Sequence, residues 1–396
     1  MVEKVKNQRV IPRSVLAGCA VASLLLLAAG CANGQGEGRD GDVSADILER
    51  QKLPDWLELS DIETMETRGN VGEKPSWYTD VELTPDQIDE LKGMNLKAAF
   101  LNWDSSAYNQ SILAGTEDSL KALGIDMVAV TNYKFDAATL QQDVRNVMAL
   151  NPDIIFYSGV DPTSDKAALQ PAVDAGVAIV SFANAPGDWT TGSPSNFVTL
   201  VSYPTHEMGA VVANEVVKRF DGGKLGMIFY DANYKLVNER EKGFEDAISA
   251  SDIEIVTRQP MVDPSKTQGI ASAMVARDAD LDVIFAPWDG PAEGVVAGLN
   301  GANKEVPVAT IDLGFSGATS IACDGLVFVE SSQMVYEWGR TAAISAGLHV
   351  LGEEVPPFLV TPVFAVTKEN IEEAWDLAYE GGIPLPKEAE ACLTEG

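Results

Sequence analysis

Residues 153–182 read DIIFYSGVDPTSDKAALQPAVDAGVAIVSF, and this stretch decides the fold. Two continuous apolar runs, 153–157 and 177–182, flank a segment with helical periodicity at 166–175. A strand that is apolar throughout is typical of a parallel sheet covered by helices on both faces. Because crossover connections between parallel strands are right-handed, the stretch predicts one strand–helix–strand unit of a doubly wound α/β sheet.

The same alternation repeats along the chain in two series, separated by a crossing strand at 197–201. Two successive series of comparable length are typical of two similar lobes. The predicted strands are 96–101, 125–130, 153–157 and 177–182 in the first series, and 225–230, 253–257, 283–286 and 306–311 in the second. The remaining segments, 325–329, 335–351 and 358–364, fit chain crossings that return to the first lobe and complete both sheets.

The composition excludes several classes of protein. The chain has 396 residues, of which 46% are hydrophobic and 22% charged, as in a packed globular protein. Its 28 Lys and Arg against 59 Asp and Glu argue against a nucleic-acid partner, because phosphates select clustered basic residues. The chain has only two His, and its sequence shows no nucleophile elbow, Cys–His arrangement or metal-ligand spacing. We therefore expect no cofactor, no metal and no enzymatic activity.

The amino terminus has the features of an export signal. Four basic residues precede a short apolar run at 15–30, which is typical of a secretory signal rather than a stable membrane span. The run ends in Ala28-Ala29-Gly30-Cys31, which resembles a bacterial lipoprotein cleavage site and implies a lipid on Cys31. Leu16-Ala17-Gly18-Cys19 matches that motif more closely but has no apolar run in front of it. A soluble secretory peptide with an incidental cysteine is the alternative.

Export has two consequences for the mature chain. Residues 31–41 are glycine-rich and polar, so we expect a flexible tether. Cys323 and Cys392 remain in the exported body, where thiols can form disulfides. The sequence leaves open whether these two cysteines meet.

The loops after the predicted strands are candidates for a ligand site, because open α/β sheets bind ligands outside the carboxyl ends of their strands. These loops are rich in Trp, Tyr, Asn and Asp. Flat rings cover sugar C–H surfaces and polar side chains bind hydroxyls, so the mixture suits a polyhydroxylated ligand. If Asp104, Asp231, Asp289 and Asp312 face inward, the cleft is acidic and favours neutral polyols or cations over anions. Helix capping is the alternative role for these aspartates.

An ordered series of short motifs extends over about residues 96–368. The series consists of Gly115, Leu123-Gly124-Ile125, Asn151-Pro152-Asp153-Ile154-Ile155, Ala175-Gly176-Val177-Ala178-Ile179-Val180, Lys242-Gly243-Phe244, Asp280-Leu281-Asp282-Val283-Ile284-Phe285-Ala286 and Val366-Thr367-Lys368-Glu369-Asn370. In this order the motifs resemble the type I periplasmic sugar-binding proteins, the ribose/galactose-binding group that serves ABC importers. The resemblance implies two doubly wound, Rossmann-like lobes joined by a three-crossing hinge, with crossings near Ser202, Ser332 and Pro356.

This reading divides the chain into a lipoprotein signal peptide (1–30), a flexible tether (31–41), an N-terminal extension (42–94), a first lobe (95–202 plus 333–356), a second lobe (203–332 plus 357–367) and a C-terminal helix and tail (368–396). The extension carries aromatic residues, including Trp56 and Trp77, between acidic segments. We expect them to dock on the first lobe, because a free linker has no use for them. A role in gating the cleft or in contacting the permease is the alternative.

The resemblance also implies ligand-binding positions. Asp312 and Gln333 match the family pattern, and Tyr108 keeps one of two rings that usually sandwich the sugar. Asn184 and Asn238 stand where the family has arginine-containing clamps, which argues against an ordinary pentose as ligand. The candidate binding residues are Trp103, Asp104, Tyr108, Asn184, Asn238, Trp288, Asp289, Asp312 and Gln333. For Trp103 and Trp288, ordinary core packing is the alternative.

The expected function is that of a solute-binding lipoprotein of an ABC importer, held at the outer face of the cell membrane by the lipid on Cys31. It would capture a sugar or polyol by hinge closure and present it to the permease. A sensory receptor for chemotaxis or signalling is one alternative. An exported glycoside-acting enzyme that uses Asp289 and Asp312 is another.

Overall fold

The computed structural model describes residues 45–159, 161–232, 234–380 and 382–395. Residues 43–396 form one compact unit, to which the description below applies. The expected signal peptide (1–30), lipidated Cys31 and tether (31–41) lie outside the described residues. Within them, no helix combines the length and the apolar character needed to cross a bilayer.

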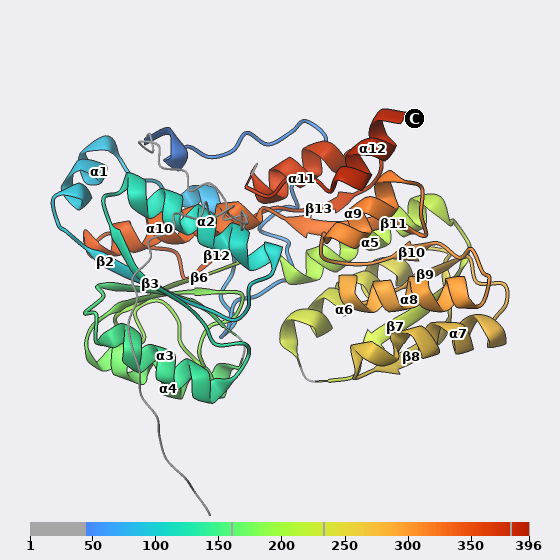
Figure 1. Ribbon diagram of the computed structural model, residues 1–396, viewed down its shortest axis with the longest axis horizontal. Helices are drawn as coiled ribbons and strands as arrows, with labels where there is room; N and C mark the ends of the chain where they lie inside the picture. The colour runs from blue at the N-terminus through green and yellow to red at the C-terminus, as the bar shows by residue number, and fades with distance from the viewer. Residues whose placement is uncertain (1–44, 160, 233, 381, 396) are drawn as a thin grey trace, which may run out of the picture. The chain divides into compact units, whose positions relative to one another are not determined.

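The first lobe is built on a seven-stranded parallel sheet with the order β1-β12-β6-β5-β4-β2-β3 (Figure 1). Helices α2 and α10 pack together on one face, and α3 and α4 pack together on the other. The elements are β1 (Ser76–Trp77), α1 (Pro85–Lys92), β2 (Lys97–Asn102), α2 (Ala107–Ala122), β3 (Asp126–Asn132), α3 (Ala137–Met148), β4 (Ile154–Ser158), α4 (Pro162–Asp174), β5 (Ala178–Phe182), β6 (Phe197–Ser202), α10 (Val335–Val350) and β12 (Phe358–Val360). Strands β4, β5 and β6 are buried along their whole length, as continuous apolar runs predict.

The second lobe contains a six-stranded sheet with the order β13-β11-β10-β9-β7-β8, in which only the described pair β11–β13 is antiparallel. Helices α5 and α6 form one packed pair, and α7 and α8 form another. The elements are α5 (Thr205–Arg219), β7 (Lys224–Tyr230), α6 (Lys235–Ser249), β8 (Glu254–Met261), α7 (Thr267–Arg277), β9 (Val283–Phe285), α8 (Asp289–Gly301), β10 (Val308–Ala309), α9 (Phe315–Ala322), β11 (Val327–Gln333) and β13 (Val363–Val366). Short 3₁₀ turns lie at Ala45–Leu48, Tyr78–Asp80 and Pro264–Lys266.

A stack of aromatic rings connects the first sheet to the hinge. The ring centroids of Phe100 and Phe182 are 5.6 Å apart, and Trp338 of α10 lies parallel to Phe182 at 6.4 Å. Tyr203, which directly follows β6, stacks on Trp338 with the ring centroids 5.5 Å apart. Burying one such side chain stabilises the fold by about 1.5–3 kcal/mol. The stack therefore fixes the start of the first crossing against the lobe core.

The predicted fold class, two doubly wound α/β lobes joined by three crossings, is confirmed. The third crossing was predicted near Pro356, and this position is wrong. The apolar run predicted as one strand at 358–364 forms two strands, of which β12 pairs with β6 in the first sheet and β13 with β11 in the second. The chain therefore changes lobes between Val360 and Val363, and residues 357–360 belong to the first sheet rather than to the second lobe. Helix α9 was not predicted at all.

The C-terminal tail forms two helices, α11 (Ile371–Tyr379) and α12 (Lys387–Glu395). A disulfide joins Cys323, at the end of α9, to Cys392 in α12. This answers the question that the sequence left open. Helix α12 packs on α9 of the second lobe, whereas α11 contacts β11 and β13 of the second lobe and also α10 of the first.

Two tryptophans of the N-terminal extension contact different lobes. Strand β1, which contains Trp77, adds an edge to the first sheet. Trp56 instead packs edge-on against Phe364 of β13 at 5.8 Å, and its indole nitrogen donates to Glu373 of α11 at 2.5 Å. The expectation that these aromatics dock on the first lobe is therefore correct for Trp77 and wrong for Trp56.

Residues 67–70 of the extension lie beside the hinge. The Thr67 hydroxyl donates to Glu207 of α5 at 2.6 Å, and Lys235 of α6 donates to the carbonyl of Gly69 at 3.1 Å. The Asn70 amide donates to the carbonyl of Gly187, in the loop after β5, at 2.5 Å. Residues 67–70 therefore link the second lobe to the first, in addition to the three chain crossings.

Arg50 anchors the extension to the first lobe. Its guanidinium forms an ion pair with Glu337 of α10 and donates to the Thr341 hydroxyl at 3.0 Å. It also donates to the carbonyls of Tyr78 at 2.8 Å and Val81 at 2.7 Å. The Glu337 side chain is fully buried, and Arg340 is its second basic partner. Arg50 thus supplies half of the positive charge around a buried carboxylate.

Replacing Arg50 by alanine should lower the free energy of unfolding by about 2–4 kcal/mol, because it leaves Glu337 buried with a single partner and removes the donors for two carbonyls. Thermal and chemical denaturation measure the effect. The matched control is Lys52→Ala, which removes a positive charge from an exposed position in the same segment. Equal stability of the two variants would contradict the anchoring role of Arg50.

Candidate functional site

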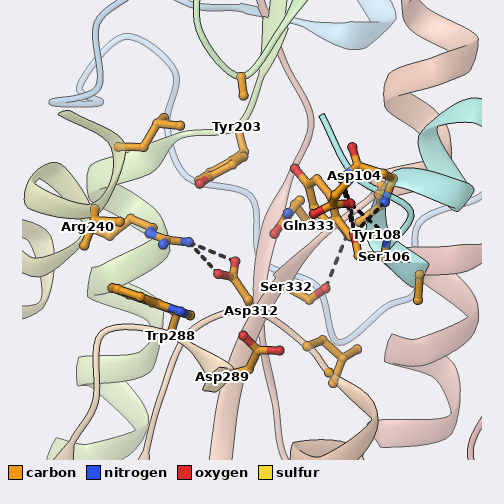
Figure 2. Close-up of a pocket in the computed structure, with 18 of the residues that line it drawn as sticks. Asp104, Ser106, Tyr108, Tyr203, Arg240, Trp288, Asp289, Asp312, Ser332 and Gln333 are labelled. Atoms are coloured by element: carbon orange, nitrogen blue, oxygen red, sulfur yellow. Dashed lines mark hydrogen bonds and ion pairs between the residues drawn. The ribbon is translucent and has the colours of Figure 1, made fainter. Parts of the chain in front are cut away.

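A cavity of about 630 Å³ lies where the carboxyl ends of strands from both sheets meet (Figure 2). Its walls come from the segments after β2, β3 and β5 in the first lobe and after β7, β9 and β10 in the second. Ser332 and Gln333 at the second crossing and Trp375 and Tyr379 of α11 complete the lining. This is where an open α/β sheet is expected to bind its ligand.

Three residues in the walls of this cavity have a strained backbone conformation. Phe135, Ala183 and Asp312 each follow a strand, line the cavity and have positive φ angles of 59°, 62° and 71°. Non-glycine residues in this left-handed region cost of the order of 1–3 kcal/mol each and persist only where their surroundings fix them. The strand ends are therefore held in conformations that aim these residues at the cavity.

A buried ion pair forms the wall of the second lobe. The guanidinium of Arg240, in α6, donates from Nη1 to both carboxylate oxygens of Asp312 at 2.8 and 3.0 Å (Figure 2). The Arg240 side chain is 6% exposed and that of Asp312 is 32% exposed. The pair thus neutralises Asp312 while leaving part of its carboxylate open to the cavity.

Close helix packing places Arg240 at this wall. Helices α5 and α6 meet at Gly209 and Gly243, where a Cβ on either glycine would lie 1.8 Å from a carbonyl oxygen of the facing helix, that of Arg240 or His206 respectively. Only glycine permits this approach. Lys242-Gly243-Phe244 is one of the motifs of the family resemblance, and the contact gives a physical reason for its glycine.

Asp289 begins helix α8 and is only partly buried as a residue, yet its carboxyl group is poorly solvated. Burial, followed by the charge of nearby Asp312, raises the pKa of Asp289 to about 6. Its Oδ1 accepts a hydrogen bond from the Gly290 amide at 2.8 Å. Both aspartates line the cavity together, as predicted, but Arg240 ties Asp312 and leaves Asp289 without an arginine of its own.

Glu330 of β11 lies buried close to this acidic group, and it is 1% exposed. Neither of its carboxyl oxygens has a hydrogen-bond partner among the described groups. Burial and the charge of Asp289 raise the pKa of Glu330 well above its ordinary value. Its carboxyl group occupies space left by Gly317 of α9, where a Cβ would lie 1.8 Å from Oε1. In the described part of the chain, no cluster of His, Cys, Asp and Glu is arranged to hold a metal ion.

Asp104 lines the cavity, but its carboxylate is used locally. Its Oδ1 accepts hydrogen bonds from the Ser106 amide at 2.8 Å, the Ser106 hydroxyl at 2.7 Å and the Asn109 side-chain amide at 2.6 Å. Ser106 in turn caps α2 by accepting from the Asn109 backbone amide. Asp104 therefore does not cap α2 itself but holds Ser106, the residue that does.

Aromatic rings form much of the cavity wall on both sides. Trp103 stacks on Phe135 at 6.1 Å in the first lobe, and Trp288 meets Tyr230 edge-on at 5.2 Å in the second. Further ring pairs involve α11, including Trp375 with Tyr379 at 4.6 Å. Phe135 is 59% exposed and Phe315, at the rim opposite, is 49% exposed. Such walls suit a ligand with flat, partly apolar faces.

Besides Asn109 Oδ1, two buried polar atoms of lining residues have no hydrogen-bond partner among the described groups. One is the acceptor Oε1 of Gln333, a residue that is 2% exposed. The other is the donor Nε of Arg240, which is 5% exposed. Buried polar atoms are almost always paired, so a ligand or water is expected to complete them. A hydroxyl group is the simplest complement, because it both donates and accepts.

The structure brings most of the predicted binding residues together. Those that line the cavity are Trp103, Asp104, Tyr108, Trp288, Asp289, Asp312 and Gln333. Asn184 and Asn238 are not among the residues that line it. The Asn184 amide instead donates to the carbonyl of Gly159 at 3.2 Å, and Asn238 Oδ1 accepts from the Tyr234 amide at 2.9 Å. Asp231 is exposed and also lies outside the lining.

Several lining residues were missed by sequence reasoning. Arg240 lies two positions after Asn238, so the arginine is present in the expected helix, although not at the position that the family pattern indicates. Trp375 and Tyr379 come from the tail beyond the region of resemblance, and nothing in the sequence linked them to the cleft. Other missed residues are Phe135, Tyr203, Tyr230, Tyr234 and Glu293. All of them lie near the end of a strand or near the start of a helix, and in this fold such positions indicate a place at the cleft.

Comparison with known proteins identifies the family. Residues 98–354 match the family model described as periplasmic binding protein domain. The chain belongs to this family. Among curated periplasmic binding proteins, it is similar to the D-ribose/D-allose-binding protein of Pseudomonas aeruginosa, with 26% identity over 231 residues, which cover 54% of this chain and 72% of the relative. It is also similar to the ribose import binding protein RbsB of Bacillus subtilis, with 23% identity over 262 residues, 65% of this chain and 83% of the relative.

Solved periplasmic binding proteins share the fold. The periplasmic ribose ABC transporter structure from Conexibacter woesei has a TM-score of 0.65 at 19% identity, covering 72% of this chain and 98% of that one. The arabinose-binding protein AraP of Geobacillus stearothermophilus has a TM-score of 0.62 at 20% identity, covering 71% and 99%. These likenesses confirm the two-lobed architecture.

The raised pKa of Asp289 predicts a pH-dependent stability. Because the folded-state pKa of about 6 exceeds the ordinary value of 3.8, the folded protein holds this proton between pH 4 and pH 6 when the unfolded chain does not. That stabilisation is lost as the pH rises through 6. Asp289→Asn should therefore stabilise the protein by roughly 1–3 kcal/mol at pH 8 and by much less at pH 4.

Thermal melts of the ligand-free protein at both pH values measure this difference. Asp231→Asn is the control, since it removes the same charge from an exposed position at the end of β7. The charged groups around Asp289 are Asp312, Glu293, Glu330 and Arg240, and they are unchanged in both variants. A stabilisation by Asp289→Asn that is the same at pH 4 and pH 8 would show that the aspartate is not the titrating group.

Proposed function

We propose that this periplasmic binding protein captures a small polyhydroxylated ligand, a sugar or polyol, between its two lobes and delivers it to the permease of an ABC importer. The observation that carries the proposal is the pair of unpartnered buried atoms in the cavity, Gln333 Oε1 and Arg240 Nε. Together they present an acceptor and a donor, which adjacent hydroxyl groups would complete. The names of the relatives, which include ribose-binding and D-ribose/D-allose-binding proteins, support the same ligand class.

The mechanism that we propose is closure of the two lobes about the three crossings. Trp103 and Tyr108 belong to the first lobe and Trp288 and Asp312 to the second, so a ligand contacts both lobes fully only when they approach each other. A ligand shifts an equilibrium by its difference in affinity for the two states, and here that difference favours the closed form. The closed form is then the species that the permease would recognise.

The loss of the family's arginine clamps bears on which sugar is bound. The first-lobe position that carries a charged pair in the family is Ala183-Asn184, and only Ala183 reaches the cavity. In the second lobe Arg240 is present but is engaged with Asp312. We therefore propose that aromatic faces hold the ligand to a greater extent than arginine clamps do.

Binding should be visible as a ligand-dependent rise in melting temperature and a compaction in small-angle scattering, measured with a panel of sugars and polyols. Gln333→Ala should raise the dissociation constant of the tightest-binding ligand about tenfold or more. The reason is that it deletes a buried acceptor that has no partner among the described groups. Gln141→Ala, an exposed position in α3, is the control and should bind as the unmodified protein does. If no member of the panel shifts the melt or compacts the protein, the solute-capture proposal fails.

We propose further that Cys31 carries the lipid that holds the protein at the outer face of the membrane. The support is the residue pattern Ala28-Ala29-Gly30-Cys31 after a short apolar run. Cys31→Ser should release the exported protein into the soluble fraction and abolish incorporation of a labelled fatty acid. Cys19→Ser, at the alternative motif, is the control and should leave both unchanged. Labelling that persists in Cys31→Ser would contradict the assignment.

A sensory receptor would use the same closed form, and no contact in the described structure separates it from a transport protein. Neighbouring genes for a permease and an ATPase would support the transport role.

A further inference from the structure

The charges in the cavity wall are strongly unbalanced. Among the described lining residues the acids are Asp104, Asp289, Glu293 and Asp312, and the single basic residue is Arg240. That arginine is already bound to Asp312 through both carboxylate oxygens. Asp104 Oδ1 is held by the hydrogen bonds of its own turn. Asp289 and Glu293 are the acidic lining residues that have neither this kind of local network nor an arginine partner.

Asp289 and Glu293 are placed to act together. They lie four residues apart in α8, which puts them on the same face of the helix. Neither forms an ion pair with any described residue. Besides burial, the charges of Asp312 and Glu293 add to the cost of ionising Asp289. A positive group bound near Asp289 would relieve this repulsion, whereas a neutral hydroxyl would not.

The neighbouring rings favour the same kind of group. Trp288, directly before Asp289, meets Tyr230 edge-on at 5.2 Å, and both line the cavity. The negative face of an indole or phenol ring attracts a cation, most strongly when water is excluded. Carboxylates beside aromatic faces form a site for a protonated amine, which can donate hydrogen bonds and interact with the rings at once.

An independent observation shows that the cavity is built to hold a ligand with hydrogen-bond donors. Gln333, which is 2% exposed, lines the cavity with an unpartnered acceptor, Oε1. The figure places it across the cavity from Trp288 and Arg240 (Figure 2). A ligand that spans this distance can place hydroxyls near Gln333 and Arg240 and an amine near Asp289.

We propose that the ligand of this cavity is an amine-bearing polyol or sugar, bound as a cation, with its ammonium group at Asp289 and Glu293 beside Trp288. This inference rests on the proposed function, because it takes the cavity to be the solute site, and it narrows the ligand class of that site. Anionic sugars, such as phosphorylated or carboxylated ones, are excluded by the same unbalanced charge.

The test uses matched pairs of ligands that differ only in the amine. Isothermal titration calorimetry of the full-length protein at pH 7 and low salt compares D-glucosamine with D-glucose and 1-amino-1-deoxy-D-sorbitol with D-sorbitol. N-acetyl-D-glucosamine provides a neutral control for the size of the substituent. In at least one pair the amine should bind about tenfold or more tightly than its parent, and added salt should reduce this preference, because hydrogen bonds to charged groups are stronger than neutral ones.

Variants assign the preference to this part of the wall. Asp289→Asn and Glu293→Gln should each reduce the amine preference several-fold, measured in each variant as the ratio of the dissociation constants of the parent and its amine. Asp231→Asn removes the same charge outside the cavity and should preserve the preference. A preference that survives both cavity variants would overturn the assignment to α8.

Failure of this inference is distinguishable from failure of the proposed function. If the parent sugar or polyol binds as tightly as its amine, the ligand is neutral, the inference is wrong and the solute-binding role stands. If no sugar, polyol or amine binds at all, both are overturned.

Discussion

The ligand cavity depends on the buried ion pair between Arg240 and Asp312, which ties helix α6 to the segment after β10. Two features of the backbone bring these two side chains together. Asp312 adopts a left-handed backbone conformation, and Gly209 and Gly243 allow α5 and α6 to pack closer than any other residues would. A buried charge left without its partner is strongly destabilising, so the pair holds both elements in place. The wall of the second lobe is thereby rigid before any ligand arrives.

The pair also determines the electrostatics of the site. By consuming the one arginine in the described lining, it leaves Asp289 and Glu293 uncompensated, and it exposes only part of the Asp312 carboxylate. The first lobe contributes a single acidic side chain to the described lining, Asp104, whose Oδ1 is held in its own turn. The two lobes therefore play different roles, one offering mainly rings and the other rings together with acids.

The architecture could be predicted because buried parallel strands leave an unmistakable pattern of apolar residues, as in β4 and β5. Where the same pattern continues across two elements, sequence reasoning fails: β12 and β13 form one apolar run, and only their hydrogen-bonded partners reveal that they belong to different sheets. Residues at strand ends, such as Trp288 and Asp312, were identified because topology places them at the cleft. Arg240 was missed because its position depends on the rotation of α6, which is set by the glycine contact with α5. Trp375 was missed because no local sequence pattern indicates that the tail returns to the cavity.

The N-terminal extension is attached to both lobes, through Arg50 on one side and through Trp56 and Thr67 on the other. If the approach of the lobes breaks one of these attachments, the free energy of that contact is subtracted from the free energy of ligand binding. The apparent dissociation constant rises in proportion as the binding-competent fraction falls, about tenfold for each 1.4 kcal/mol of contact released. The segment that precedes the family match at residues 98–354 thus links the lobes in addition to the three crossings. Substitutions far from the cavity can set the solute concentration at which the receptor responds, without touching the groups that recognise the solute.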